Sequence, residues 1–145
     1  MDKTTITKHL YNDSVSQALT YVSEITDEET LFVYAHNYNW DNGFDVPIAI
    51  LHNSYCSLSI ALLIFYRADG IIFLQDKKSA EGTKEWIAFV SNLYNRILAN
   101  EFTRGNASFN PGLSKVEEFK LRKSLSEEEK IFIEAIEGTD YYINL

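Results

Sequence analysis

The sequence is poor in cysteine, proline and glycine, with one, two and six of them, and it lacks a long apolar run. A single cysteine, Cys56, excludes a disulfide within the chain and suits a reducing compartment. The longest apolar run, residues 60–66, is too short to span a bilayer. The beginning of the chain is polar and does not resemble a secretory signal. We therefore expect a cytoplasmic protein that does not bind membranes.

Basic residues are also scarce, because 13 Lys and Arg stand against 21 Asp and Glu, which gives a net charge of −8. Most of this excess lies in the first 75 residues, where three Lys and Arg stand against nine Asp and Glu. Nucleic acids require a basic face, so direct binding to them is not expected. The acidic front half permits attraction to a basic protein, although an acidic surface can also serve solubility alone.

Motifs for catalysis and metal binding are missing as well. The glycines are scattered singly, so there is no phosphate-binding loop, and no serine lies in a nucleophile elbow. His36 and His52, with Asp41 and Asp45, could be imagined as a metal site, but their spacing fits no ligand motif. A half-buried His36 bonded to a carbonyl is the simpler interpretation. We expect no metal, no cofactor and no catalytic residue, and therefore no enzyme.

What the sequence does contain is helical periodicity. Apolar residues recur every three or four positions from Ser14 to Ile25 and again from Leu31 to Tyr38. Thr26 and Glu29 form a capping-box pattern that predicts the start of the second of these helices at Thr26. Further helices are expected over residues 47–53, 57–68, 86–100, 113–124 and 126–138. Helix 57–68 is apolar nearly all round, so we expect it to be the central buried helix.

The remaining segments are predicted to connect or to dock. Residues 1–13 form a polar leader, 77–82 a polar break and 103–112 a loop with glycine and proline. Residues 71–75 fit either a minor strand or an apolar link. The residues after 138 are apolar enough to dock on the core. We expect a single, mostly α domain over residues 1–145, with about six helices in antiparallel pairs around helix 57–68 and at most a minor strand near 71–75.

The stretch HNYNWDNGFDVP, residues 36–47, stands out between two apolar segments. As a structural corner, its Asn and Asp side chains cap helix ends while Trp40 and Phe44 anchor it in the core. As a functional site, it presents an acidic and aromatic patch to a protein partner. The candidate partner-binding residues are Tyr38, Trp40, Asp41, Asp45, Asp69 and Asp76. A second candidate surface is the cluster Glu127, Glu128 and Glu129, although helix capping explains it equally well.

Two motifs lie within residues 38–70. The first consists of Asn39, Trp40, Asp41, Gly43, Phe44 and Pro47. The second consists of Cys56, Leu58, Ala61, Leu62, Phe65, Tyr66, Ala68, Asp69 and Gly70. Together they resemble the bacterial domain-of-unknown-function 4274 family, although Ser57, Ser59 and Ile60 depart from its pattern. Ser57 can still cap a helix in place of the family's Asp. The resemblance implies a helical fold and confers no activity.

Small acidic bacterial proteins of this type resemble the immunity proteins of toxin–immunity pairs, including those of contact-dependent growth inhibition. Many toxin domains are basic nucleases, which an acidic inhibitor would attract and cover. We therefore expect an immunity protein that blocks a cognate toxin domain, as a monomer or as a heterodimer with the toxin. Two alternatives stay open: a non-enzymatic adaptor domain, and a metal-dependent hydrolase that uses His36 and Asp41.

Overall fold

The computed structural model describes residues 1–77 and 82–145, and its regular elements are helices. The α-helices are α1 (Lys3–Asn12), α2 (Val15–Glu24), α3 (Glu28–Asn37), α4 (Asp45–His52), α5 (Leu58–Arg67), α6 (Gly70–Gln75), α7 (Lys84–Leu98) and α8 (Lys115–Ser124). Two short 3-10 helices are η1 (Trp40–Asn42) and η2 (Glu128–Phe132). In the described ranges, strand-type pairing is limited to two isolated bridges, Ala107–Thr139 and Phe109–Ile136. The predicted mostly α fold is confirmed.

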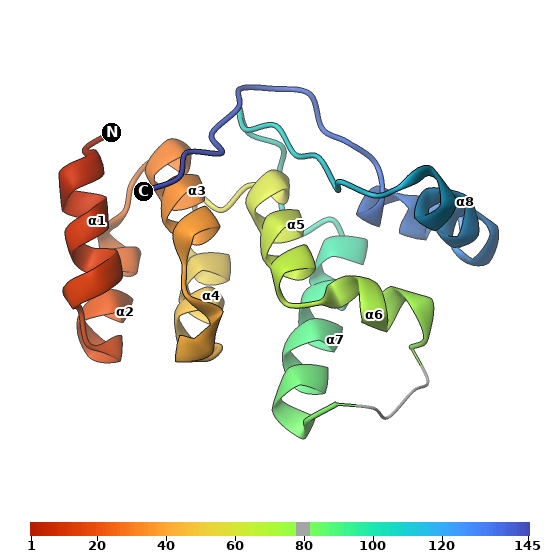
Figure 1. Ribbon diagram of the computed structural model, residues 1–145, viewed down its shortest axis with the longest axis horizontal. Coiled ribbons are helices and arrows are strands. Elements are labelled where there is room, and N and C mark those ends of the chain that lie inside the picture. Colours follow the sequence, from red (N-terminus) through yellow and green to blue (C-terminus); the bar gives the residue numbers. More distant parts are fainter. Residues whose placement is uncertain (78–81) are drawn as a thin grey trace.

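The helices stand side by side in successive pairs, α1 with α2, α3 with α4, and α5 with α7 (Figure 1). Within this row α1 packs on α3 and α3 on α5, while α2 packs extensively on α4. Helix α5 lies at the centre, in contact with α3, α4, α6 and α7, and every residue from Leu58 to Phe65 is buried. The prediction of a central buried helix is therefore confirmed.

Short polar residues fix where several helices begin. Ser14 and Gln17 form a capping box at α2, and the Ser57 hydroxyl accepts a hydrogen bond from the Ile60 N–H at α5. At α3 the cap is Asp27, whose carboxylate accepts from the Thr30 N–H at 2.8 Å, and not Thr26 as the sequence pattern predicts. An ionised carboxylate is favoured over a hydroxyl at the positive end of a helix dipole.

The expected polar leader, residues 1–13, is instead mostly helix α1. Asp2 caps it by accepting from the Thr5 N–H at 3.1 Å, and Ile6 is fully buried beneath it. Ile6 and the partly buried Leu10 are the apolar residues that pack it on the core, and two such residues do not make the apolar stripe by which helices are recognised in a sequence. The sequence pattern did not predict a helix in this polar segment.

Residues 71–75 form helix α6 and not a strand. The turn before it places Asp69 in the left-handed conformation, with φ of 60°. Gly70 follows, where an added Cβ would collide with the Phe65 ring and backbone. Helix α6 packs against α5, α7 and α8. A run of six residues is too short to show a helical period, which explains why the sequence suggested a minor strand or a link.

The helix expected over residues 126–138 shrinks to η2. The predicted capping role of Ser126 is confirmed, since its hydroxyl accepts from the Glu129 N–H at 3.3 Å and Glu129 accepts from the Ser126 N–H at 3.1 Å, although η2 itself begins only at Glu128. The chain then leaves the helix and pairs with the predicted loop 103–112. Phe109 and Ile136 exchange two backbone hydrogen bonds of 2.9 and 2.8 Å. Tertiary pairing thus overrides a strong local helix signal.

Residues 136–145, which we call the return segment, run back along the row of helices to α3 (Figure 1). The Tyr141 and Tyr142 rings pack edge-on against Phe32, with centroids 6.0 and 5.1 Å away. Asn37 donates to the Ile143 carbonyl and accepts from the Leu145 N–H. The predicted docking of these last residues is confirmed.

Two further expectations concern the predicted polar break and the lack of a membrane-spanning segment. The polar break predicted over residues 77–82 lies mostly outside the described residues. Among the helices of the described part, none combines the length and the apolar character needed to cross a bilayer.

Candidate functional site

The corner between α3 and α4 is braced from inside by Tyr38. Its ring is only 8% exposed, and its hydroxyl donates to the Gly43 carbonyl at 2.7 Å. Burial, and then the nearby Asp45 carboxylate, raise the pKa of Tyr38 to about 12, so the hydroxyl keeps its proton and its hydrogen bond. Tyr38 was predicted to face a partner, but the structure places its ring inside the corner.

Trp40 and Phe44 anchor the corner onto α7. The Trp40 ring lies edge-on to Phe89 at 6.2 Å, and the Phe44 ring stacks on Phe89 at 4.7 Å. Trp40 is half-buried, and its indole N–H is buried without a hydrogen-bond partner in the described part of the chain. The structural interpretation of these two aromatic residues as anchors is therefore confirmed.

The carboxylates of the corner face solvent. Asp41 and Asp45 are both exposed. Asp45 lies in the first turn of α4, where the helix dipole stabilises its negative charge. Asn39 fixes the turn by accepting from the Asp41 N–H at 3.0 Å. The corner thus holds two solvent-facing carboxylates on a rigid aromatic base.

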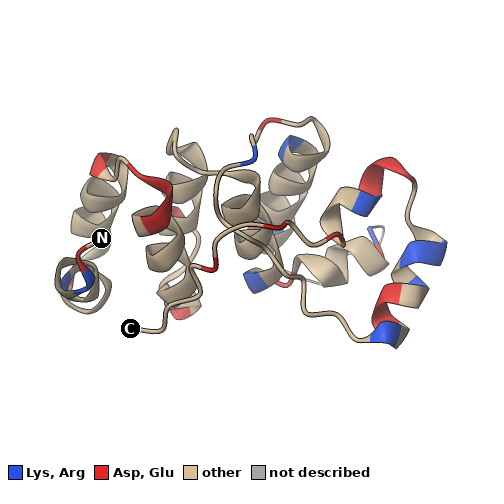
Figure 2. Ribbon diagram, turned by 90° about the horizontal axis from the view of Figure 1, so that it is seen from above, with Lys and Arg blue, Asp and Glu red and all other residues tan. Residues whose placement is uncertain are grey.

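The other predicted carboxylates lie elsewhere. Asp69 and Asp76 are exposed at the two ends of α6, which packs on α5, α7 and α8. The six predicted partner-binding residues therefore come from the corner between α3 and α4 and from the two ends of α6. Figure 2 shows that the acidic residues are spread along the molecule, whereas basic residues gather mainly on α8 and its neighbours.

The second candidate surface is reduced by burial. The Glu129 side chain accepts hydrogen bonds from the Tyr94 hydroxyl at 2.8 Å and from Lys77 Nζ at 2.9 Å. Burial alone would raise the pKa of Glu129, but these bonds and that from the Ser126 N–H lower it to about 2. Only Glu127 and Glu128 face solvent, and Glu127 pairs with Lys130 at 2.7 Å. Glu129 is a structural residue.

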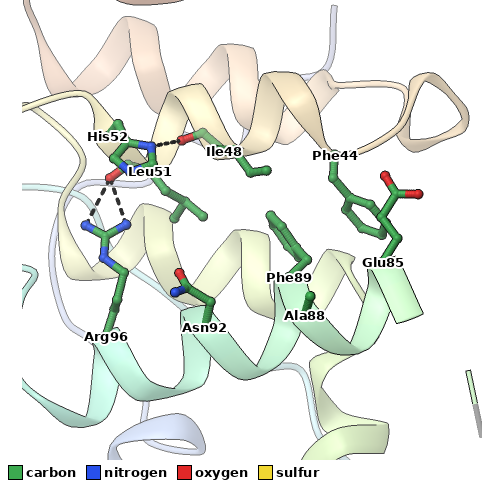
Figure 3. A pocket seen from close by; sticks show the side chains of 9 residues that line it. All are labelled: Phe44, Ile48, Leu51, His52, Glu85, Ala88, Phe89, Asn92 and Arg96. Atoms are coloured by element: carbon green, nitrogen blue, oxygen red, sulfur yellow. Dashed lines mark hydrogen bonds between the residues drawn. The ribbon is translucent and has the colours of Figure 1, made fainter. Parts of the chain in front are cut away.

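A groove between α4 and α7 was not predicted from the sequence. It has a volume of about 350 Å³, and Figure 3 shows the side chains that line it. The lining residues are Phe44, Ile48, Leu51, His52, Glu85, Ala88, Phe89, Asn92 and Arg96. The two helices run in the same direction, with Phe44 and Glu85 at one end and His52 and Arg96 at the other (Figure 3). They are far apart in the sequence, so no local pattern indicates that they line one groove.

Contacts at both ends hold the groove open in a fixed shape. At one end Phe44 stacks on Phe89, and at the other Arg96 donates to the Leu51 carbonyl at 3.4 Å. Arg96 also pairs with Glu101 at 3.1 Å. Between these bridges the floor is mostly apolar, and α4 and α7 make little direct contact. Such a groove can accept apolar side chains from outside.

The histidines are engaged in local hydrogen bonds. Half-buried His36 is bonded through Nε2 to the Asn144 side-chain carbonyl at 2.8 Å and through Nδ1 to Arg67 at 2.8 Å. Because Arg67 can only donate, Nδ1 accepts and Nε2 carries the proton. His52 Nδ1 is bonded to the Ile48 carbonyl. The predicted half-buried His36 bonded to a carbonyl is confirmed, the carbonyl being that of an Asn side chain.

Metal ligands and the thiol complete the chemical inventory. Within residues 1–77 and 82–145, no three His, Cys, Asp or Glu side chains lie close enough together to hold a metal ion. Cys56 is buried, and burial raises the pKa of its thiol far above the usual range. The thiol therefore behaves as a small apolar group, as predicted from its neighbours in the sequence.

The family model described as Domain of unknown function (DUF4274) matches residues 26–98, half of the chain. The chain belongs to this family. The DUF4274 region begins just before α3 and ends with α7, so it contains both the acidic corner and the α4–α7 groove. Helices α1, α2 and α8 and the return segment lie outside it. No curated protein and no solved structure matches the chain.

Proposed function

We propose that the protein is a cytoplasmic immunity protein, which binds a basic bacterial toxin domain and blocks it without chemistry of its own. The observation that carries this proposal is the corner between α3 and α4, where exposed Asp41 and Asp45 stand on a base fixed by Tyr38, Trp40 and Phe44. Opposite charges on toxin and inhibitor accelerate their encounter.

Rigidity is the second support for this role. Inhibitors that bind tightly lose little conformational freedom on binding, because their contact residues are already in place. The Tyr38 hydrogen bond and the stack of Phe44 on Phe89 preorganise the corner in this sense. In the described part of the chain no contact joins His36 to Asp41, so no observation favours the alternative of a metal-dependent hydrolase.

The first test is co-expression. The reading frame directly upstream of the gene is expressed in a bacterial host, alone and together with this protein, and surviving colonies are counted. We expect the upstream product to arrest growth and this protein to restore it. A harmless upstream product that still binds this protein would overturn the immunity role in favour of the adaptor domain.

The second test concerns the corner. The variant with Asp41→Asn and Asp45→Asn should associate with the toxin domain roughly tenfold more slowly at low salt, and high salt should abolish the difference. A variant with Glu134→Gln and Glu137→Gln has the same charge change at an exposed site elsewhere and should associate as the wild type does. Equal rates for both variants would show that the corner does not face the toxin.

A further inference from the structure

We propose that α8 of one copy of this protein docks in the α4–α7 groove of a second copy, so that the chain associates with itself. This inference is independent of the proposed function, because it needs no toxin. It rests on two surfaces that the described residues leave exposed, and on their complementary shape and charge.

The first surface is the outward face of α8. Val116 and Phe119, one helical turn apart, are 62% and 60% exposed, whereas Leu121 on the opposite side is buried. Lys123 follows on the same face as Phe119, and its Nζ lies 4.5 Å from the centroid of the Phe119 ring. Helix α8 therefore presents two large apolar side chains followed by a cation.

The second surface is the groove. Its floor offers Ile48, which is 40% exposed, and the small side chain of exposed Ala88 on the facing helix. Exposed Glu85 stands at the end where α4 and α7 begin (Figure 3). A third helix can settle between two helices when its apolar ridge enters their groove.

Charge selects the direction of the docked helix. If α8 runs antiparallel to α4 and α7, its last turn, with Lys123, lies at the Glu85 end of the groove. The negative end of the α8 dipole then meets the positive ends of α4 and α7. From Val116 to Lys123 the helix rises about 10 Å, and from Glu85 to Arg96 about 16 Å, so the groove is long enough.

The contact must form between two copies. In its own chain α8 packs on α6, and Leu121 faces inward. The docked face is small, with two apolar residues and one ion pair, so the association should be weak and strongly dependent on concentration. The same contact, repeated reciprocally, gives a dimer, and repeated in one direction it gives a chain of molecules.

Sedimentation velocity of the full chain across a range of concentrations tests the proposal. We expect the mean mass to rise with concentration, and Phe119→Ser and Ala88→Glu each to weaken association at least tenfold. Tyr55→Ser, which removes an exposed aromatic ring outside both surfaces, is the matched control and should associate as the wild type does. Circular dichroism confirms that each variant folds.

Cross-linking tests the direction of the helix. A chain with Glu85→Cys is mixed with a chain carrying Lys123→Cys or Lys115→Cys, and disulfide formation is followed under mild oxidation. Buried Cys56 does not interfere. We expect the Lys123→Cys mixture to cross-link faster than the Lys115→Cys mixture. A monomer up to ~1 mM, association unaffected by Phe119→Ser, or faster cross-linking from Lys115→Cys would each overturn the proposal.

Discussion

Glu129 illustrates how a single acidic residue can belong to the core. It is buried between α7 and the start of η2, where Tyr94, Lys77 and the Ser126 N–H donate to its carboxylate. Its pKa in the folded protein is about 2, against an ordinary value of 4.5. The ionised form therefore stabilises the fold fully above about pH 4.5, and this stabilisation is lost as the pH falls toward 2.

We expect Glu129→Gln to lower the free energy of unfolding at neutral pH by on the order of 2 kcal/mol. The difference from the wild type should narrow steadily as the pH falls from about 4.5 to about 2. Urea denaturation at a series of pH values measures it. Exposed Glu137→Gln serves as the control, and a Glu129→Gln deficit that stays constant with pH would contradict the assignment.

At the same scale, the sequence reveals some residue roles and hides others. The cap Ser57 could be predicted, because a cap acts on backbone N–H groups only two or three residues away. The inward position of Tyr38 could not, since it depends on how the chain doubles back at Gly43. Glu129 looks like a surface residue in the sequence because its partners Lys77 and Tyr94 come from other segments.

Among the elements, the segment after η2 shows most clearly how long-range pairing defeats a local pattern. Residues 126–138 carry a helical pattern, yet the chain extends so that Ile136 can pair with Phe109. Helix α6 shows the converse, because a short apolar run is helical where Leu74 packs into the core and the helix contacts α5, α7 and α8. The long helix α7, with a strong apolar stripe and the Thr83 cap, was predicted correctly because its pattern is repeated over four turns.

Gly138 makes this pairing possible. A Cβ at this position would collide with the Asn106 carbonyl and would lie 3.0 Å from the Ala107 carbonyl carbon and the Ser108 nitrogen. We expect Gly138→Ala to lower the free energy of unfolding by roughly 1–3 kcal/mol, because the backbone of the two segments must separate. The neighbouring exposed Glu137→Ala should change it by less than about 0.5 kcal/mol. Chemical denaturation measures the free energy of unfolding of both variants. Equal values for Gly138→Ala and Glu137→Ala would contradict the close approach of Gly138 to the backbone of residues 106–108.

In the whole molecule, the return segment packs against α3 and pairs with the loop 103–112, which lies much later in the sequence than α3. Tyr142 packs on Phe32 and on His36, and its hydroxyl accepts from the Asn110 N–H at 3.4 Å. Stacked helix pairs by themselves contact only their neighbours, so such arrays tend to unfold in parts. The return segment joins α1 and α3 to the loop 103–112, and we expect it to make unfolding more cooperative.

Removing the Tyr142 ring tests this bridging role. Tyr142→Ala should lower the free energy of unfolding by about 2–3 kcal/mol, because the edge-to-face contact with Phe32 and the apolar burial of the half-buried Tyr142 ring are both lost. Tyr142→Phe keeps the ring and should cost less than about 0.5 kcal/mol. Denaturation followed by both circular dichroism and tryptophan fluorescence should show coincident transitions in the wild type and separated ones in Tyr142→Ala. Coincident transitions in both would assign cooperativity to the helix pairs alone.

The groove between α4 and α7 is the feature of the whole molecule that could not be predicted from the sequence. The composition, the acidic front half and the apolar α5 predicted a helical protein with a carboxylate-rich corner, and the DUF4274 match covers that corner. The groove depends on α4 and α7 being held apart by Phe44, Phe89 and Arg96 at its two ends. The pattern of residues within α4 or within α7 does not indicate how far apart the two helices lie.

The bond between His36 and Asn144 joins residues 108 positions apart. Helix pairs such as α1 and α2 can form within microseconds from residues close in the chain, whereas closing so long a loop costs entropy before any contact repays it. The rate of folding should therefore be set by the return segment and not by the helices. Substitutions that remove return-segment contacts already formed in the folding transition state would slow refolding. Substitutions that remove contacts formed later would mainly speed up unfolding.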